Sequence, residues 1–307
     1  MDILQKLKEV KEDSTSTASV RLQNLLNEAE RLSLPPAPPT MTTSTTTTAL
    51  QFCTKVSQAI DVIGRSMLLY PPRHPATTTS TTATTTEKKR QRIGLSFNGG
   101  KDCTVVLHLL LAALEDAKSS TTTTPPKKTT LLDCILPFYF STQDVFAEEL
   151  DFVQRTAETF FNGKANLLTM ADVRNEDGVT TLVENYGIKA FLMGTRSTDP
   201  DGRWLNGVFW PSSKGWCPFM RINPCLDWSY HEVWVFLRFF NIEYCTLYDV
   251  GFTSIGSKST SFPNPMLKQA KAKGKGEETA ANDEYHPAYL LPDGAQERAG
   301  RIKSTKK

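Results

Sequence analysis

The run from Ser96 to Asp102, with the sequence Ser-Phe-Asn-Gly-Gly-Lys-Asp, contains residue types that bind phosphate. It joins a short apolar stretch at 93–97 to a longer one at 103–114, and this pattern predicts a buried strand that turns into a buried helix. Paired glycines at such a turn present backbone N–H groups at the positive end of the helix, where a phosphate can bind. The spacing matches neither the P-loop nor the dinucleotide fingerprint. The run therefore predicts a nucleotide site of another kind.

Individual residues of this run suit different tasks. Backbone N–H groups from Asn98 to Lys101 would hold the β- and γ-phosphates, and the Lys101 ammonium is a candidate point charge. Asp102 either orients the loop or contacts Mg²⁺ through water, or it is an ordinary acid at a helix N-terminus, which the helix dipole favours without any function. Cys103 and His108 lie on the helix that follows, and we interpret both as core residues rather than catalytic ones.

Strands and helices alternate from residue 92 onward. We expect strands at 93–97, 131–140, 165–170 and 190–194, and helices at 101–117, 147–161 and 180–186. This order predicts an α/β fold of the Rossmann-like class, with a parallel sheet, right-handed crossovers and helices on both faces. Ligands bind such sheets beyond the carboxyl ends of the strands, so three segments should converge on one crevice: 96–102, 140–143 and 195–201. The crevice would then contain Phe140, Thr195, Arg196 and Asp199.

Threonine-rich tracts divide the chain. They lie at 42–48, 77–86 and 119–130, and we interpret them as linkers or an expanded loop because they carry too little apolar surface to offset the entropy of ordering. Helical spacing predicts helices at 20–32 and 50–69 that pack on the main domain. The predicted division is a helical region at 1–90, a nucleotide-binding domain at 91–265 and a C-terminal arm at 266–307, with a flexible lysine-rich segment at 268–278.

Aromatic residues gather in two places. Trp204, Trp210 and Trp216 lie outside helical periodicity, in a segment where a tryptophan either anchors a loop or forms the wall of a site for a flat ring. The run at 229–241 places its aromatic side chains at helical spacing, which is more typical of a core than of a ligand site.

Composition argues against several classes of protein. The net charge of +2 gives no overall field for nucleic acid or an anionic membrane, so an anion site must be built locally. The longest apolar run is too short to span a bilayer, and the first residues lack the apolar core of a signal peptide. The six cysteines are scattered without a CxxC pair. We expect a cytoplasmic protein without membrane or nucleic-acid partners, and a monomer because no heptad seam is visible.

Continued to Cys103, the glycine run resembles the pyrophosphate loop of the ATP pyrophosphatase (PP-loop) superfamily, whose pattern is Ser-Gly-Gly-x-Asp-Ser. Asn98 and Cys103 stand where many members have serine or threonine, and this variant is similar to the loop of the fungal FAD synthase (FMN adenylyltransferase) family. Further blocks resemble that family in the same order, at 194–200, 218–228, 247–256, 263–265 and 297–302. One departure is Ser213, where relatives often carry an aspartate.

The resemblance implies an adenine nucleotide alpha hydrolase-like fold and the transfer of AMP from ATP to FMN, which gives FAD and pyrophosphate, with Mg²⁺ on the ATP phosphates. It implies catalytic roles for Asn98, Asp102, Asp199 and Arg298. It implies substrate contacts for Ser96, Phe97, Asn98, Gly99, Gly100, Lys101, Phe140, Thr195, Arg196, Ser213, Trp216, Arg298 and Arg301. Within this set, Trp216 would form the wall for the flavin ring, and the two arm arginines would close over the phosphates.

Two alternatives stay open at this point. Adenylylsulfate and phosphoadenylylsulfate reductases share the loop but need a cysteine in a C-terminal Glu-Cys-Gly-type motif, whereas Cys245 lies in Glu-Tyr-Cys-Thr. A nucleotide- or flavin-binding regulator that has lost turnover is the other, and Ser213 is its one hint. A tRNA-modifying adenylating enzyme would need paired cysteines and a basic face, which the sequence lacks.

Overall fold

The structure is a computed structural model of the chain, and it describes residues 2–33, 48–72, 92–119, 130–269 and 283–302. Most of the threonine-rich tracts lie outside these described residues, as does nearly all of the lysine-rich segment at 268–278. No helix in the described part of the chain is long and apolar enough to cross a membrane.

A six-stranded sheet forms the centre of the molecule, in the order β3-β2-β1-β4-β6-β5. Its strands are β1 (Ile93–Ser96), β2 (Ile135–Ser141), β3 (Leu168–Ala171), β4 (Ala190–Leu192), β5 (Phe209–Pro211) and β6 (Met220–Ile222). All neighbours run parallel except the edge strand β5, which is antiparallel to β6. In the middle of the sheet, Ile93 lies between Ile135 and Ala190. The parallel α/β sheet expected from the alternating pattern is confirmed.

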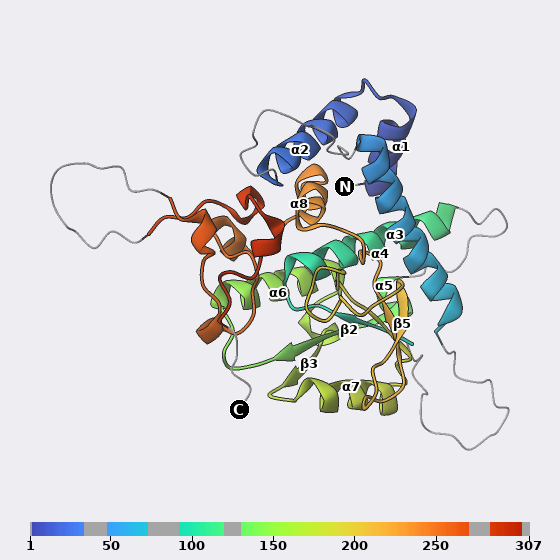
Figure 1. Ribbon diagram of the computed structural model, residues 1–307. Helices are drawn as coiled ribbons and strands as arrows, with labels where there is room; N and C mark the ends of the chain where they lie inside the picture. The colour runs from blue at the N-terminus through green and yellow to red at the C-terminus, as the bar shows by residue number, and fades with distance from the viewer. Residues whose placement is uncertain (1, 34–47, 73–91, 120–129, 270–282, 303–307) are drawn as a thin grey trace, which may run out of the picture.

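Helices cover both faces of this sheet, as Figure 1 shows. One face carries α3 (Ala49–Leu69), α4 (Lys101–Ser119), α6 (Ala147–Phe160) and α8 (Tyr230–Phe239), and α7 (Asn175–Glu184) covers the other. Alternation along β4 serves both layers, because Ala190 and Leu192 belong to the larger core whereas Phe191 packs with the α7 residues. The aromatic run at 229–241 is core, as its spacing indicates, with Trp234, Phe236 and Phe240 almost fully buried.

Several predicted boundaries were wrong. The expected strand at 131–140 begins with a helical turn, α5 (Leu131–Cys134), because the backbone N–H and hydroxyl of Thr130 both donate to Asp133 Oδ2 and cap a helix there. The expected strand at 165–170 begins only at Leu168, after a short 3₁₀ turn. The expected helix at 180–186 starts earlier, at Asn175. Strands β5 and β6 were not predicted, because three-residue strands leave almost no periodicity to detect.

The N-terminal helices belong to the same core as the sheet. Helix α2 (Thr17–Ser33) and helix α3 match the predicted helices, and α1 (Ile3–Glu12) was missed. Its buried residues Ile3, Leu7 and Val10 do follow helical spacing, among lysines and glutamates that obscure it. Leu7, Leu22 and Phe52 bring the three helices into the core that also contains Ile93 of β1, so the expectation that these helices pack on the main domain is confirmed.

The described part of the C-terminal arm, residues 283–302, is docked against the body of the protein. Ala288 and Leu291 are fully buried. The Tyr230 hydroxyl donates to the Ala288 carbonyl at 2.7 Å, and His231 Nε2 lies 2.9 Å from the Leu291 carbonyl. Further along, Arg301 forms an antiparallel bridge with Ser261. These contacts fix the arm at the N-terminal end of α8 and beside Ser261, and Figure 1 shows the arm in red.

Candidate active site

The glycine loop lies between β1 and α4, at the carboxyl edge of the sheet. Gly99 has φ +75°, and a Cβ there would lie 3.0 Å from Val153 Cγ2 of α6, so only glycine fits without strain. Asn98 Oδ1 accepts hydrogen bonds from the Gly100 N–H and from the Cys103 thiol, both at 3.1 Å. The loop therefore already holds one oxygen atom on its donors, in the manner in which it would hold a phosphate oxygen.

Two side chains of the loop point into the protein. Phe97 is fully buried and contacts Phe152 and Phe161, so only its backbone is available to a ligand. Lys101 is 2% exposed, and its ammonium donates to Asp102 Oδ2 at 3.0 Å and to Glu297 Oε1 of the arm. The Lys101 N–H donates to the Tyr248 hydroxyl at 2.9 Å. In this structure the Lys101 ammonium is paired with two carboxylates, as a buried ammonium must be, and its expected role as a point charge on the phosphates stays a prediction.

A network of buried ion pairs extends from Lys101 through Arg196, which is 1% exposed. Arg196 Nε lies 3.2 Å from Asp102 Oδ1, and Arg196 Nη2 lies 2.6 Å from Glu297 Oε2 and 3.2 Å from Asp199 Oδ1. Its backbone N–H also donates to Asp199 Oδ2 at 2.8 Å. The network joins the start of α4, the loop after β4 and the C-terminal arm, which are distant in sequence.

The charges of the network shift its titrations in opposite directions. Burial alone would raise the pKa of Asp102, but Lys101 and Arg196 together hold that pKa below its ordinary value. The pKa of Asp199 is raised by burial, which outweighs the attraction of Arg196. The pKa of Lys101 is raised, because its two carboxylate partners outweigh the burial that opposes its charge. The network thus sets two basic side chains, Lys101 and Arg196, against three carboxyl groups, those of Asp102, Asp199 and Glu297.

A cavity of about 470 Å³ opens beside this network, beyond the ends of β1, β2 and β4. It brings together five of the predicted contact residues: Ser96, Phe140, Thr195, Ser213 and Trp216. Trp216 packs edge-on against Phe219, with ring centroids 6.2 Å apart, and the exposed Trp204 also lines the cavity. Its walls suit a planar aromatic ring.

The Ser213 hydroxyl accepts a hydrogen bond from Arg221 Nη2 at 3.2 Å. The second amino group of Arg221 donates to the Pro211 carbonyl at 2.7 Å, and the guanidinium lies over the Phe219 ring. Burial lowers the pKa of Arg221, although an arginine side chain keeps its charge in proteins. Arg221 therefore supplies a positive charge to this cavity, and its contact with Ser213 is one of those that hold the guanidinium in place.

The arm places its two arginines differently. Arg298 is exposed, directly after the buried Glu297 carboxylate. Arg301 is half-buried, and its guanidinium packs over Gly256, where a Cβ would lie 2.2 Å from Nη2. The Glu297 carbonyl accepts from the Thr253 hydroxyl at 2.6 Å, and Asn264 Nδ2 donates to the neighbouring Gln296 carbonyl at 2.9 Å. Both arginines thus stand on an anchored backbone.

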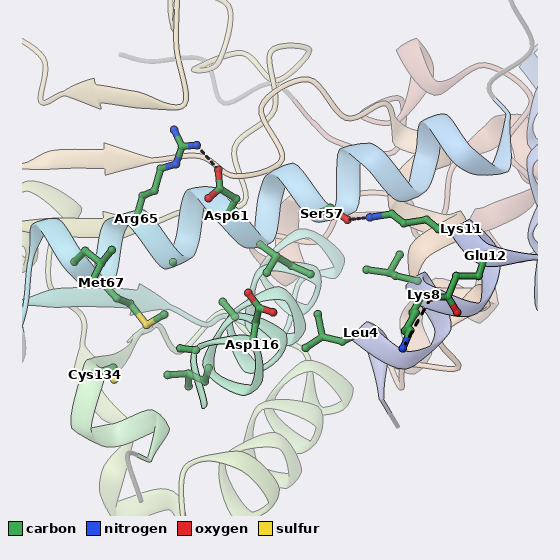
Figure 2. Close-up of a pocket in the computed structure, with 17 residues that line it drawn as sticks. Leu4, Lys8, Lys11, Glu12, Ser57, Asp61, Arg65, Met67, Asp116 and Cys134 are labelled. Atoms are coloured by element: carbon green, nitrogen blue, oxygen red, sulfur yellow. Dashed lines mark hydrogen bonds and ion pairs between the residues drawn. The ribbon is translucent and has the colours of Figure 1, made fainter. Parts of the chain in front are cut away.

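A second cavity, of about 850 Å³, lies elsewhere, between α1, α3 and α4 (Figure 2). Several of its charged side chains bond to other residues that line it. Arg65 lies 2.7 Å from Asp61, and Lys11 donates to Ser57 at 2.8 Å. The residues that line this cavity include none from the glycine loop or from the strand ends. It therefore lacks the backbone N–H groups of the loop that could bind a phosphate.

Five of the six cysteines are buried, and Cys217 is half-buried. Burial raises the pKa of Cys245 to about 11 and that of Cys103 to about 12. Both thiols are therefore protonated at neutral pH and closed to solvent, which is unfavourable for a nucleophile. The half-buried His108 contacts the Thr104 carbonyl and the Phe160 ring, as expected for a residue packed between helices.

Sequence reasoning missed three residues of the site. Glu297 lies in a quoted motif, but nothing local in the sequence says that its carboxylate is buried against Lys101 and Arg196. Tyr248 accepts from the glycine loop across 147 residues of chain. Arg221 was passed over as part of a motif, and its position on β6, where it lines the cavity, is what makes it a candidate site residue.

The family model of the phosphoadenosine phosphosulfate reductase domain matches residues 92–263, more than half of the chain. The chain belongs to this family. The pyrophosphate-loop resemblance expected from the glycine run is thereby confirmed, together with the fold class. The match spans β1 to the loop before the C-terminal arm, and so includes the glycine loop, Arg196 with Asp102 and Asp199, and the aromatic cavity, but not Glu297 of the arm.

Named relatives point to one branch of the family. The "Probable FAD synthase" of Schizosaccharomyces pombe is 38% identical over 213 residues, which are 69% of this chain and 72% of that protein. The "Probable FAD synthase" of Caenorhabditis briggsae is 33% identical over 211 residues, which are 68% of this chain but 36% of that protein. The chain thus matches little more than a third of the length of the nematode relatives.

Solved structures agree with the fold. The crystal structure of Candida glabrata FMN adenylyltransferase in complex with ATP aligns with a TM-score of 0.63 over 94% of this chain and 97% of that one. The sequence identity in this alignment is 22%. The likeness therefore concerns the arrangement of the elements, including N-terminal helices and a C-terminal arm outside the family match.

Proposed function

We propose that this protein is an FAD synthase, which transfers AMP from ATP to the phosphate of FMN and releases pyrophosphate. The observation that carries the proposal is the buried network through Lys101, Arg196 and Glu297, which joins the glycine loop, the strand-end loop and the arm beside an aromatic cavity. The relatives named FAD synthase and the C. glabrata enzyme solved with ATP support the same activity.

The chemistry needs positioning more than acid–base catalysis. A phosphate monoester with a second pKa of about 6 is largely dianionic at neutral pH, so the FMN phosphate oxygen is itself the nucleophile. It attacks the α-phosphorus of ATP. The new P–O bond forms as the bond from the α-phosphorus to the bridging oxygen breaks, and that electron pair leaves with pyrophosphate. Donors and cations that face the growing charge are the main means of lowering the barrier.

The glycine loop and the N-terminus of α4 would hold the β- and γ-phosphates, which become the leaving pyrophosphate. Asn98 Oδ1 now occupies the Gly100 N–H, so a phosphate oxygen would displace it and free the Asn98 side chain to contact the α-phosphate. Arg298, exposed on the arm directly after Glu297, would meet the phosphates directly. Glu297, held by Lys101 and Arg196, positions Arg298. In this scheme Asp102 and Asp199 orient Arg196 rather than touch substrate.

The aromatic cavity would take the planar rings. Phe140 and Thr195, at the ends of β2 and β4, suit an adenine edge and face. Trp216 and Ser213, on the loop between β5 and β6, suit the flavin, with Arg221 as the nearby positive charge. A Trp216→Ala variant tests this division. It should raise KM for FMN about tenfold, a loss of about 1.4 kcal/mol, and leave KM for ATP within about twofold. The opposite result would assign Trp216 to adenine.

Magnesium would enter with ATP rather than reside in the protein. Both oxygens of Asp102 lie within 3.2 Å of Lys101 or Arg196, and a carboxylate paired with two cations is a poor direct ligand for Mg²⁺. Within the described residues, no group of three or more His, Cys, Asp or Glu side chains is arranged to hold a metal ion. The residues therefore fit MgATP as a substrate better than a resident metal site.

The test is incubation of the purified full chain with ATP, Mg²⁺ and FMN, followed by chromatography for FAD and an assay for pyrophosphate. Equimolar FAD and pyrophosphate are expected. Binding of both substrates without product would support the regulator instead, and reduction of adenylylsulfate would support the reductase. The buried Cys245, with its raised pKa, argues against the reductase. The monomeric state and the cytoplasmic location stay predictions.

A further inference from the structure

Glu149 is a buried carboxylate in the first turn of α6, directly beneath the glycine loop. It is 7% exposed. Its backbone oxygen lies 3.4 Å from the position of a Cβ at Gly99, so it belongs to the helical turn on which the loop rests. Its Oε2 atom is buried and accepts no hydrogen bond from any described residue. A buried carboxylate oxygen without a partner is costly, so its position calls for an explanation.

Arg301 supplies the complementary group. Its Nε is also buried and donates no hydrogen bond within the described part of the chain. The arm holds its backbone in place through the bridge to Ser261 and through the Arg301 N–H, which donates to the Arg298 carbonyl at 2.9 Å. Glu149 and Arg301 attract each other, yet they form no ion pair within 4.0 Å. The arginine is thus attracted by Glu149 but not clamped by it.

We propose that Glu149 is a positioning residue that keeps the Arg301 guanidinium near the glycine loop in the free protein and releases it to a substrate phosphate. The inference rests on the proposed function, which places Arg301 over the substrate phosphates. A phosphate offers a larger charge than one carboxylate and grips a guanidinium through two hydrogen bonds. Because Glu149 attracts Arg301 without a direct ion pair, it can orient the guanidinium while leaving its N–H groups available to a substrate phosphate.

Release of Arg301 changes the proton affinity of Glu149. Burial raises the pKa of Glu149 to about 7, and Arg301 is the charge that opposes this rise. The other titratable groups that interact with Glu149 are Tyr139 of β2 and Cys245 before the 3₁₀ turn at Thr246–Val250, and both stay neutral because burial raises their pKa. Arg298 acts on Arg301 as a like charge. When Arg301 moves to a phosphate, Glu149 should therefore take up a proton at neutral pH.

Calorimetry of ATP binding measures this proton. The full chain is titrated with ATP and Mg²⁺ at pH 7 in two buffers of different ionisation enthalpy, and the difference in heat gives the number of protons exchanged. The wild type should take up more protons than Glu149→Gln. Glu148→Gln is the matched control, because Glu148 is the exposed acid beside Glu149 in the same turn, and it should match the wild type. The comparison between variants cancels the protonation of ATP itself.

Steady-state kinetics tests whether the effect passes through Arg301. Glu149→Gln should lower kcat/KM about tenfold, part of the roughly 10²-fold loss that a small misplacement of a contact can cause. Glu149→Asp, which keeps the charge, should recover part of it. The double variant Glu149→Gln/Arg301→Ala should be no worse than Arg301→Ala alone, because an absent side chain cannot be positioned. If Glu149 were merely structural, Glu149→Gln would lower the melting temperature, and the fold-losses in kcat/KM of Glu149→Gln and Arg301→Ala would multiply in the double variant.

Equal proton uptake by the wild type and Glu149→Gln overturns the inference, and so do losses that multiply in the double variant. The proposed function fails on a different result, the absence of FAD when the wild type is given ATP, Mg²⁺ and FMN. In that case the calorimetry with ATP still decides the role of Glu149, and a wild type that does not bind ATP refutes both.

Discussion

Replacing Lys101 with methionine tests whether this lysine of the glycine loop holds the protein together or holds phosphate. In the structure it is 2% exposed and pairs with Asp102 and Glu297. Its loss leaves Arg196 alone against three carboxylates, Asp102, Asp199 and Glu297. Removing one partner of a buried ion pair costs about 3 to 5 kcal/mol, because the remaining charge stays buried and uncompensated. We expect Lys101→Met to lose about that much unfolding free energy.

Urea unfolding of three variants and the wild type measures this loss. Lys101→Met and Glu297→Gln should each unfold at a lower urea concentration than the wild type. The double variant should recover part of the sum of the two losses, because it again leaves the network with one excess negative charge, as in the wild type. Lys189→Met is the matched control. This lysine is exposed, so its replacement should change the unfolding free energy by less than about 0.5 kcal/mol.

The opposite pattern would refute the reasoning. A Lys101 that contacts the ATP phosphates would give a Lys101→Met variant as stable as the Lys189→Met control, with KM for ATP raised about tenfold. Strict additivity of the losses in Lys101→Met and Glu297→Gln would likewise show that the two side chains are not partners.

Three further predictions concern the same site. Arg298→Ala and Asn98→Ala should each lower FAD formation by about 10²-fold, the effect of removing one charge-stabilising contact, with unchanged circular dichroism because both side chains are exposed. As pH rises from about 4 to 8, the wild type should lose about 3 kcal/mol of unfolding free energy relative to Glu149→Gln. The reason is that the pKa of the Glu149 carboxyl is raised from 4.5 to about 7 in the folded protein. The protonated carboxyl therefore stabilises the folded state fully below pH 4.5, and this stabilisation is lost as the pH passes 7. A difference in unfolding free energy between the wild type and Glu149→Gln that stays constant from about pH 4 to 8 would contradict this prediction. Chelation of Mg²⁺ should abolish FAD formation, and metal analysis of dialysed protein should find no stoichiometric Mg²⁺ without ATP.

The sequence determined the parallel sheet, because β1, β2 and β4 are apolar runs followed by polar turns, a pattern that local physics makes recognisable. It also determined the glycine loop, since a positive φ at Gly99 and the start of α4 follow from neighbouring residues. Local sequence patterns did not predict the strands at the other side of the sheet. The edge strands β5 and β6 gain their hydrogen bonds from pairing with each other and with β4, so their own residues hold little signal.

The tertiary structure decided what each charged residue does. The sequence predicts substrate contacts for a lysine, an arginine and an aspartate of the crevice. In the structure, burial leaves Lys101 and Arg196 paired with carboxylates, and one of these, Glu297 of the arm, lies 196 residues from Lys101 and 101 residues from Arg196. Whether a charge faces solvent, a ligand or another charge depends on desolvation, and desolvation depends on which distant segments fold over it. The same cause hid Glu149, which is a helical acid like its neighbour Glu148 but is buried in the turn on which the glycine loop rests.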